Sequence, residues 1–211
     1  LAAERRPSDF PMLTQLGNLL VNQGERERAL RMFENAAPLD AATRDATFVT
    51  LSVEMGRLYL LSDQTENAAD RFEIVRAALE DPAKFGMSEA QRRKLGAPDV
   101  LYAVMGESFY EAGRLDQAQE AYTKSHEIKP NEPLLAFRLA RVASKQRDWA
   151  EARRQLEVYL AAHSADAGLA PYELLRELLS QESEETEEVK ERLAVPAVVR
   201  ACKKPGRIIR T

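Results

Sequence analysis

Residues 99–130 read DVLYAVMGESFYEAGRLDQAQEAYTKSHEIKP, and this stretch carries a pattern that occurs four times in the chain. The pattern here consists of Tyr102-x2-Met105-Gly106-x2-Phe109, followed by Ala118-x3-Tyr122. Spacings of three, four and seven residues place such side chains on one face of a helix. The stretch therefore predicts two helices, with Gly113 at the turn between them and Pro130 after the second.

The same pattern recurs at three other places. It is carried by Leu13, Leu16, Gly17, Leu20, Ala29 and Phe33 in the first copy, by Ser52, Met55, Gly56, Tyr59, Ala68 and Phe72 in the second, and by Ala136, Leu139, Ala140, Ala143, Ala152 and Leu156 in the fourth. The alanines of the predicted second helices, at 29, 68, 118 and 152, lie 39, 50 and 34 residues apart. Repeats of this length indicate stacked helical hairpins that bury their apolar faces against one another.

The repeated pattern resembles the tetratricopeptide repeat (TPR), a helix–turn–helix unit of about 34 residues. The resemblance extends from Phe10 to Ala162 and implies an all-α fold, a right-handed solenoid of about four helical hairpins. We place the solenoid at residues 8–194, with units near 10–39, 40–82, 98–131 and 132–163 and an insertion at 83–97. Two positions depart from the family pattern, where Ser52 replaces a bulky residue and Ala140 replaces glycine.

Small residues recur on the first helix of each unit, opposite a large residue on the second. We expect the small residues to let the paired helices approach closely and the large ones to fill the space between units. The small residues are Gly17, Gly56, Gly106 and Ala140, and the large ones are Phe33, Phe72, Tyr122 and Leu156.

The two spacings that exceed 34 residues, 39 and 50, require additional residues between the units. We assign the first to an extended helix start between Asp40 and Phe48, with Asp40 as the N-cap. The second lies between Pro82 and Pro98, where Ser88 to Gln91 form the sequence of a capping box that opens one short helix, closed by Gly96. We interpret this insertion as an elaborated loop; the alternative is a lid over one rim of the groove.

The C-terminal part predicts a capping helix and a tail. Apolar residues at helical spacing indicate a capping helix over 169–193, which includes an acidic stretch from Glu182 to Arg192. Residues 195–211 contain five basic residues and no acidic one, so we expect a basic tail or a linker to another domain. The chain begins at Leu1, and we interpret it as a fragment or a processed form.

Composition excludes several classes of protein. The 211 residues are 45% hydrophobic and 30% charged with a net charge of −4, which argues against a disordered chain and a general nucleic-acid binder. No apolar run is long enough to span a membrane. One cysteine and two histidines cannot build a Cys/His zinc site, and we expect no metal, cofactor or small-molecule substrate. The sequence does not determine the cellular compartment of the protein, and the cytoplasm is slightly favoured.

No arrangement of residues indicates catalysis. We expect His126 and His163 to lie near helix C-termini, where a histidine interacts favourably with the helix dipole. We read Cys202, between Arg200 and Lys203, as an incidental residue of the tail, although nearby cations can activate a thiol. The chain is therefore predicted not to be an enzyme.

The resemblance to TPR proteins implies that the first helices line a concave groove that binds a peptide or protein segment. The groove residues it implies include Asn18, Arg57, Tyr110, Phe137, Arg138, Arg141 and Lys145. We expect Asn18 to bond a peptide backbone, Tyr110 to stack, and the arginines to bind carboxylates. Alternatively, Glu107 and Glu111 form ion pairs with the basic residues of the next first helix. The groove then has no net electrostatic field that would attract an acidic peptide.

The predicted function is a non-catalytic protein–protein interaction module with a protein or peptide partner. The alternative is a structural spacer or self-association segment of a larger multidomain protein. The sequence argues against the two-carboxylate clamp of chaperone-tail binders, because only Asn18 matches one of its five positions. Nucleic acid is an unlikely partner and would involve the basic tail.

Overall fold

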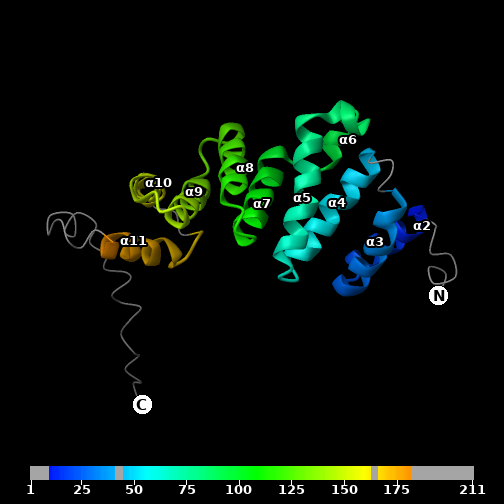
Figure 1. Ribbon diagram of the computed structural model, residues 1–211, viewed down its shortest axis with the longest axis horizontal. Helices are drawn as coiled ribbons and strands as arrows, with labels where there is room; N and C mark the ends of the chain where they lie inside the picture. Colours follow the sequence, from blue (N-terminus) through cyan, green and yellow to red (C-terminus); the bar gives the residue numbers. More distant parts are fainter. Residues whose placement is uncertain (1–9, 41–44, 163–165, 182–211) are drawn as a thin grey trace, which may run out of the picture. The chain divides into compact units, whose positions relative to one another are not determined.

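The computed structural model describes residues 10–40, 45–162 and 166–181, and the regular structure among them is entirely helical (Figure 1). Eight helices form four hairpins: α2 (Phe10–Asn22) with α3 (Arg26–Asp40), α4 (Ala46–Leu60) with α5 (Thr65–Glu80), α7 (Pro98–Glu111) with α8 (Leu115–Ile128), and α9 (Pro133–Lys145) with α10 (Trp149–Ala161). The 3₁₀-helix η1 (Pro82–Phe85) and helix α6 (Glu89–Lys94) lie between α5 and α7 in the sequence, and α11 (Ala170–Gln181) follows α10. The predicted all-α repeat fold is confirmed.

The chain divides into two compact units. Unit 1, residues 1–130, holds α2 to α8, and unit 2, residues 131–211, holds α9 to α11. In unit 1, side chains from α2, α3 and α4 share a buried cluster that includes Leu13, Phe33 and Met55. In unit 2, α9, α10 and α11 share a second cluster that includes Leu156 and Leu178. Each unit thus has apolar packing of its own.

The small residues of the first helices determine how closely each hairpin packs. A Cβ atom at Gly56 would lie 2.8 Å from the Phe72 ring, and one at Gly106 would lie 2.5 Å from the Tyr122 ring. A Cβ at Gly17 would likewise overlap the ring of Phe33. The close approach predicted at the small residues is therefore confirmed in these three hairpins, where the aromatic ring lies against the backbone of the first helix of its own hairpin.

The start of α4 corrects one prediction. Helix α3 continues through Asp40, so Asp40 is the last residue of a helix rather than the N-cap of the next. The N-cap is Asp45, whose carboxylate accepts hydrogen bonds from the backbone N–H of Thr47 at 2.8 Å and of Phe48 at 3.2 Å. Asp45 directly precedes the apolar face that begins at Ala46, whereas four residues separate Asp40 from that cap.

The insertion between α5 and α7 is a packed piece of structure. Ser88 Oγ accepts a bond from the N–H of Gln91 at 3.3 Å, and the Gln91 side chain accepts one from the N–H of Ser88 at 2.9 Å. This confirms the predicted capping box and its short helix. Three apolar side chains of the insertion, those of Phe85, Met87 and Leu95, are buried.

Helix α11 closes unit 2. Its Leu174, Leu175 and Leu178 are buried against α9 and α10, whereas Glu173, Arg176 and Glu177 are exposed. The predicted capping helix is therefore present as far as Gln181. The remaining predictions for residues 182–193, for the tail 195–211 with Cys202, and for His163 lie outside the described residues. Within the described part of the chain, no helix is long and apolar enough to cross a membrane.

Candidate interaction surface

The first helices of unit 1 carry three of the predicted groove residues. Asn18 is exposed on α2, and Arg57 is partly exposed on α4. Tyr110 on α7 is only 8% exposed, so the flat ring face predicted for stacking is largely covered. Of these three residues, Asn18 and Arg57 present polar groups to solvent.

Arg57 is held by its own helix and lies beside the insertion. Its Nη1 donates to Glu54 Oε1 at 3.1 Å, one helical turn earlier. A Cβ atom added at Gly96 would lie 3.8 Å from Arg57 Nη2, so the end of the insertion approaches this side chain. Gly96 has a φ of +117°, a conformation that glycine adopts without strain. The insertion thus borders one residue of the predicted groove.

Helix α9 of unit 2 carries the other four. The Phe137 ring is 5% exposed and lies 5.4 Å from the Tyr159 ring, centroid to centroid, at a tilt of 42°. Phe137 is therefore part of the core of unit 2. The basic residues Arg138, Arg141 and Lys145 are three and four positions apart, so they share a face of the helix. Arg138 and Arg141 are partly exposed and Lys145 is exposed.

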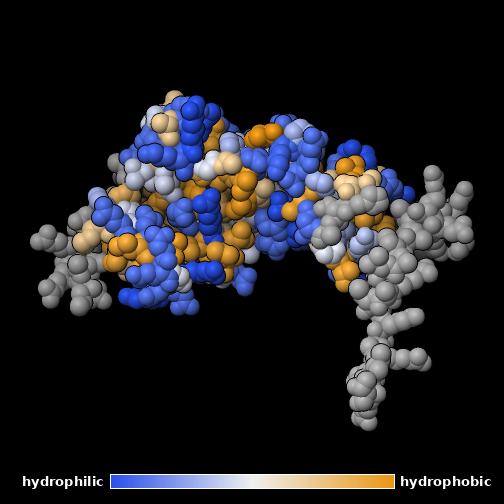
Figure 2. Space-filling view, turned by 180° about the vertical axis from the view of Figure 1, so that it is seen from behind, coloured by the Kyte–Doolittle hydropathy of each residue, from blue (hydrophilic) through white to orange (hydrophobic). Residues whose placement is uncertain are grey.

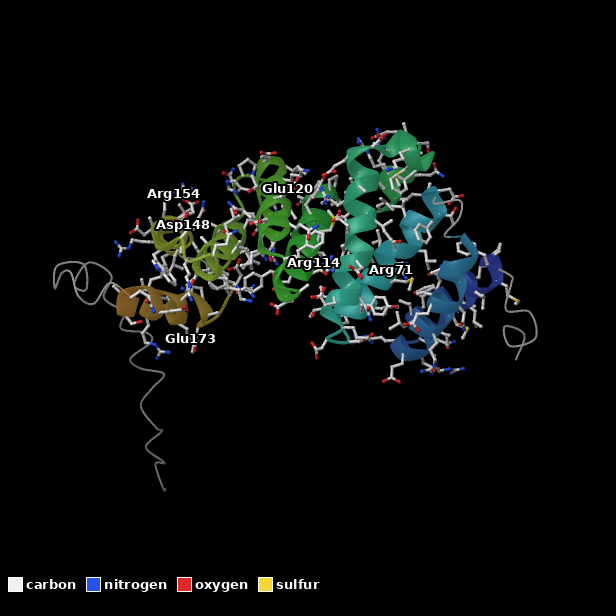
Figure 3. All side chains as sticks on the ribbon, viewed as in Figure 1. Arg71, Arg114, Glu120, Asp148, Arg154 and Glu173 are labelled. Carbon is white, nitrogen blue, oxygen red and sulfur yellow. The ribbon has the colours of Figure 1, made fainter. Side chains whose placement is uncertain are left out.

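A row of polar contacts joins the second helices α5 and α8 of unit 1, and Figure 3 labels two of the residues, Arg114 and Glu120. Arg114 Nη2, labelled in the figure, donates to Glu66 at 2.8 Å and to Asp70 at 2.6 Å. The other contacts between the two helices are Gln117 with Glu73 at 2.7 Å, Arg76 with Glu120 at 3.8 Å and Lys124 with Glu80 at 3.0 Å. We call these residues the α5–α8 ladder. These side-chain contacts fix how the second helices of the two hairpins are aligned along one another.

The ladder shifts the pKa values of its members. The hydrogen bond from Arg76 to Glu73 raises the pKa of Arg76 above its usual value, against the opposing effect of burial. Burial raises the pKa of Glu80, but the hydrogen bond from Lys124 and the charge of Arg76 outweigh it, so the net shift is downward. Hydrogen bonds to Asp70 and Glu66 raise the pKa of Arg114. All these shifts favour the charged forms, as expected for mutually compensating ion pairs.

The sequence analysis did not predict the α5–α8 ladder, although its paired residues are separated by a constant number of positions in the sequence. Four of its contacts, Asp70 with Arg114, Glu73 with Gln117, Arg76 with Glu120 and Glu80 with Lys124, join residues 44 positions apart. A constant separation at helical spacing is what two parallel helices from successive repeats produce. A search for complementary charges at a fixed offset of 44 residues finds three of the four, because Gln117 is uncharged.

Comparison with known families gives two matches. Models described as tetratricopeptide repeat match residues 13–45 and residues 109–170. The chain therefore contains tetratricopeptide repeats in these two stretches. Neither match includes residues 46–108, the part of this TPR protein that holds α4, α5 and the insertion.

Solved structures show the same fold. YrrB, described as a TPR protein with an unusual peptide-binding site, is 18% identical; the alignment covers 96% of each chain with a TM-score of 0.60. MamA from residue 41 to its end, from Desulfovibrio magneticus RS-1, is 21% identical; the alignment covers 78% of this chain and 81% of MamA, with a TM-score of 0.54. No protein with a curated description matches the sequence significantly.

The TPR fold positions few groups for chemistry. Among the described residues, no three His, Cys, Asp or Glu side chains gather to hold a metal ion. His126 lies in the last turn of α8, where the sequence placed it, and is partly buried.

Proposed function

We propose that this TPR protein is a non-catalytic protein–protein interaction module that binds an acidic peptide or protein segment on the basic face of α9. The TPR family supports a protein partner. YrrB, a relative in fold, is described as having a peptide-binding site, which supports a peptide as the form of the ligand.

The observation that carries the proposal is the division of α9 into two faces. Ala136, Ala140 and Ala143 are buried within unit 2 and allow the close approach of α10. Arg138, Arg141 and Lys145 lie on another face, and α9 contains no acidic residue. Guanidinium groups bind carboxylates through paired hydrogen bonds, so this basic face is the part of α9 that can recognise an acidic segment.

The remaining predicted residues take different parts in the proposal. Asn18 and Arg57 are polar side chains on the first helices of unit 1, and the proposed α9 face in unit 2 does not include them. Tyr110 and Phe137 contribute mainly through burial, because each shows less than a tenth of its surface. Their role is to hold α7 and α9 in place.

Selection from a random peptide library on the immobilised chain tests the proposal. We expect the enriched peptides to be rich in Asp and Glu, with an affinity that weakens as salt is raised. The variant with Arg138→Glu and Arg141→Glu should lose at least tenfold in affinity for these peptides in isothermal titration calorimetry.

A matched control carries the same change of charge elsewhere in unit 2. The variant with Arg154→Glu and Arg176→Glu alters two exposed arginines on α10 and α11. It should bind like the native chain, and circular dichroism should show equal helicity in all three proteins. Equal affinity of the native chain and the Arg138/Arg141 variant would reject α9 as the binding face. Equal losses of affinity in the two double variants would mean that the net charge of the chain, and not the α9 face, determines binding.

A further inference from the structure

One face of α4 is more deeply buried than the same face of the other first helices in unit 1. Val49 and Val53 lie seven and three residues before Gly56, and each is at most 1% exposed. Residues at the same distances before Gly17 and Gly106 are all partly exposed, namely Phe10 and Thr14 in α2 and Asp99 and Ala103 in α7. An additional element therefore covers this face of α4.

The insertion between α5 and α7 is that element. Val49, Val53 and Arg57 are spaced four residues apart, so they share one face of α4. A Cβ atom added at Gly96, near the end of the insertion, would lie 3.8 Å from Arg57 Nη2. Of the hairpins in unit 1, α4–α5 is the one that the insertion follows. The insertion thus lies over the first-helix face of this hairpin.

Buried apolar side chains hold the insertion in this position. Phe85, Met87 and Leu95 are buried, as are the two valines of α4. Moving the insertion away would expose all five side chains to water, at a cost comparable to the stability of a whole small domain. The insertion is therefore a fixed part of unit 1, and its outer surface replaces the face of α4 that it covers.

This outer surface is basic. Residues 83–97 contain four basic residues and one acidic residue, in a chain whose net charge is −4. The four basic side chains are all exposed, namely Lys84, Arg92, Arg93 and Lys94. Three of them form the last turn of α6. Figure 2 shows mostly hydrophilic surface at the upper left, where the insertion and the end of α5 lie.

The positive charges of the insertion exceed what its one carboxylate can balance. Glu89 forms ion pairs with both Arg92, at 2.9 Å, and Arg93, at 3.3 Å. Within the part of the chain that the structure describes, neither Lys84 nor Lys94 has an ion pair. The shared carboxylate holds the two guanidinium groups close together, beside an ammonium group without an acidic partner.

We propose that the insertion is a docking surface for an acidic segment of a partner protein, separate from the α9 face. Paired hydrogen bonds from guanidinium groups suit carboxylates, and a surface that is already rigid loses little entropy on binding. Glu80, Asp81 and Asp99 flank the insertion in the sequence and would repel the closely spaced phosphates of a nucleic acid. A protein segment can instead place a few carboxylates on α6 alone.

Fluorescence anisotropy with a labelled peptide of alternating glutamate and alanine tests this proposal in the full chain. The starting protein is the double glutamate variant of α9, which should still bind the peptide, but more weakly than the native chain. Adding Arg92→Glu and Lys94→Glu should lower the remaining affinity at least tenfold. Adding Arg26→Glu and Arg31→Glu, which reverse two exposed arginines of α3, is the matched control and should leave it unchanged.

Carbodiimide cross-linking locates the peptide without altering the insertion, because this reagent joins carboxylates to the lysine amines that they contact. In the starting protein we expect cross-links to Lys84 or Lys94, and cross-links only to other lysines overturn the proposal. So do the absence of peptide binding by the starting protein, equal losses in the two added variants, or tighter binding of a single-stranded RNA of equal length.

The same measurements separate this proposal from the proposed function. If the double variant of α9 binds the peptide as tightly as the native chain, and only the variant of the insertion loses affinity, the α9 face is rejected and the insertion remains a binding surface. If only the α9 variant loses affinity, the docking surface on the insertion is rejected.

Discussion

At the scale of single residues, each hairpin packs by matching a small residue on the first helix to a large one on the second. Three hairpins pair glycine with an aromatic ring, and the fourth pairs Ala140 with Leu156 in the core of unit 2. The methyl group that Ala140 adds is offset by the smaller Leu156 side chain. The substitutions at these two positions therefore compensate for each other in volume.

This compensation predicts a measurable coupling in the first hairpin. Gly17→Ala places a methyl group in the Phe33 ring and should lower the free energy of unfolding by about 1–3 kcal/mol. Phe33→Leu alone should cost about 1–2 kcal/mol through lost packing. The double variant should be more stable than the sum of the two losses predicts, as a urea-unfolding double-mutant cycle can measure. Strict additivity would show that the two side chains do not share one space.

Tyr59 predicts a loss of stability in alkali. Burial, together with a hydrogen bond to Glu34 at 2.9 Å, raises the pKa of Tyr59 to about 12. Between pH 10 and 12 the unfolded chain releases this proton while the native chain keeps it, so the free energy of unfolding falls as pH rises. Because the hydroxyl is only partly buried, we expect a contribution of about 1–2 kcal/mol.

The measurement compares urea unfolding of Tyr59→Phe and the native chain at several pH values from 8 to 12. The difference in stability between the two proteins should change over pH 10–12 and stay constant below pH 10. Tyr172→Phe removes a tyrosine from unit 2 and serves as the control for the number of tyrosines. If the free energy of unfolding falls equally with pH in Tyr59→Phe and in the native chain, ionisation of Tyr59 does not cause the loss of stability in alkali.

At the scale of elements, the α5–α8 ladder aligns two hairpins across a sequence separation that no local pattern spans. Arg76 lies at its centre, bonded to Glu73 at 2.7 Å and Glu80 at 2.7 Å on α5 and facing Glu120 on α8. Arg76→Met keeps much of the stem but removes the charge, so it should lower the free energy of unfolding by about 1 kcal/mol at low salt and less at high salt. Urea unfolding at two salt concentrations measures both values.

The same variant should change the acid side of the stability profile. The pKa of Glu80 lies below its usual value near 4.5, so its contribution to stability is present above that value and is lost as pH falls below it. Removing Arg76 should flatten this decline. Arg28→Met is the control, because Arg28 pairs with Glu25 within one hairpin of the same unit. Equal effects of the two variants would mean that the ladder adds nothing beyond ordinary surface pairs.

The elements that sequence analysis predicted correctly depend on local contacts. Ser88 and Gln91 cap the same turn, so four residues suffice to predict α6. Sequence analysis placed the N-cap at Asp40 and not at Asp45, because the position of the cap depends on where α3 stops. The burial of Phe137 against Tyr159, and the ladder, depend on contacts between helices. A pattern within one helix does not contain them.

At the scale of the whole molecule, the chain consists of two units with separate apolar clusters. In repeat proteins each repeat contacts only its neighbours, so stability is distributed rather than pooled in one core. The last described helix of unit 2 is α11, whose Leu178 is buried with Leu156 and Tyr159. Removing the leucine side chain therefore acts first on the hairpin that α11 covers.

This argument predicts a local response to Leu178→Ala. The loss of the side chain and the resulting cavity should cost about 2–4 kcal/mol, concentrated in unit 2. Hydrogen exchange followed by mass spectrometry should show faster exchange in peptides from α9, α10 and α11 and unchanged exchange in peptides from α4 and α5. Phe72→Ala, which removes a buried ring from α5, should give the reverse pattern. Uniform acceleration in both variants would mean that the two units unfold as one cooperative body, and stability would then have to be assigned to the chain as a whole.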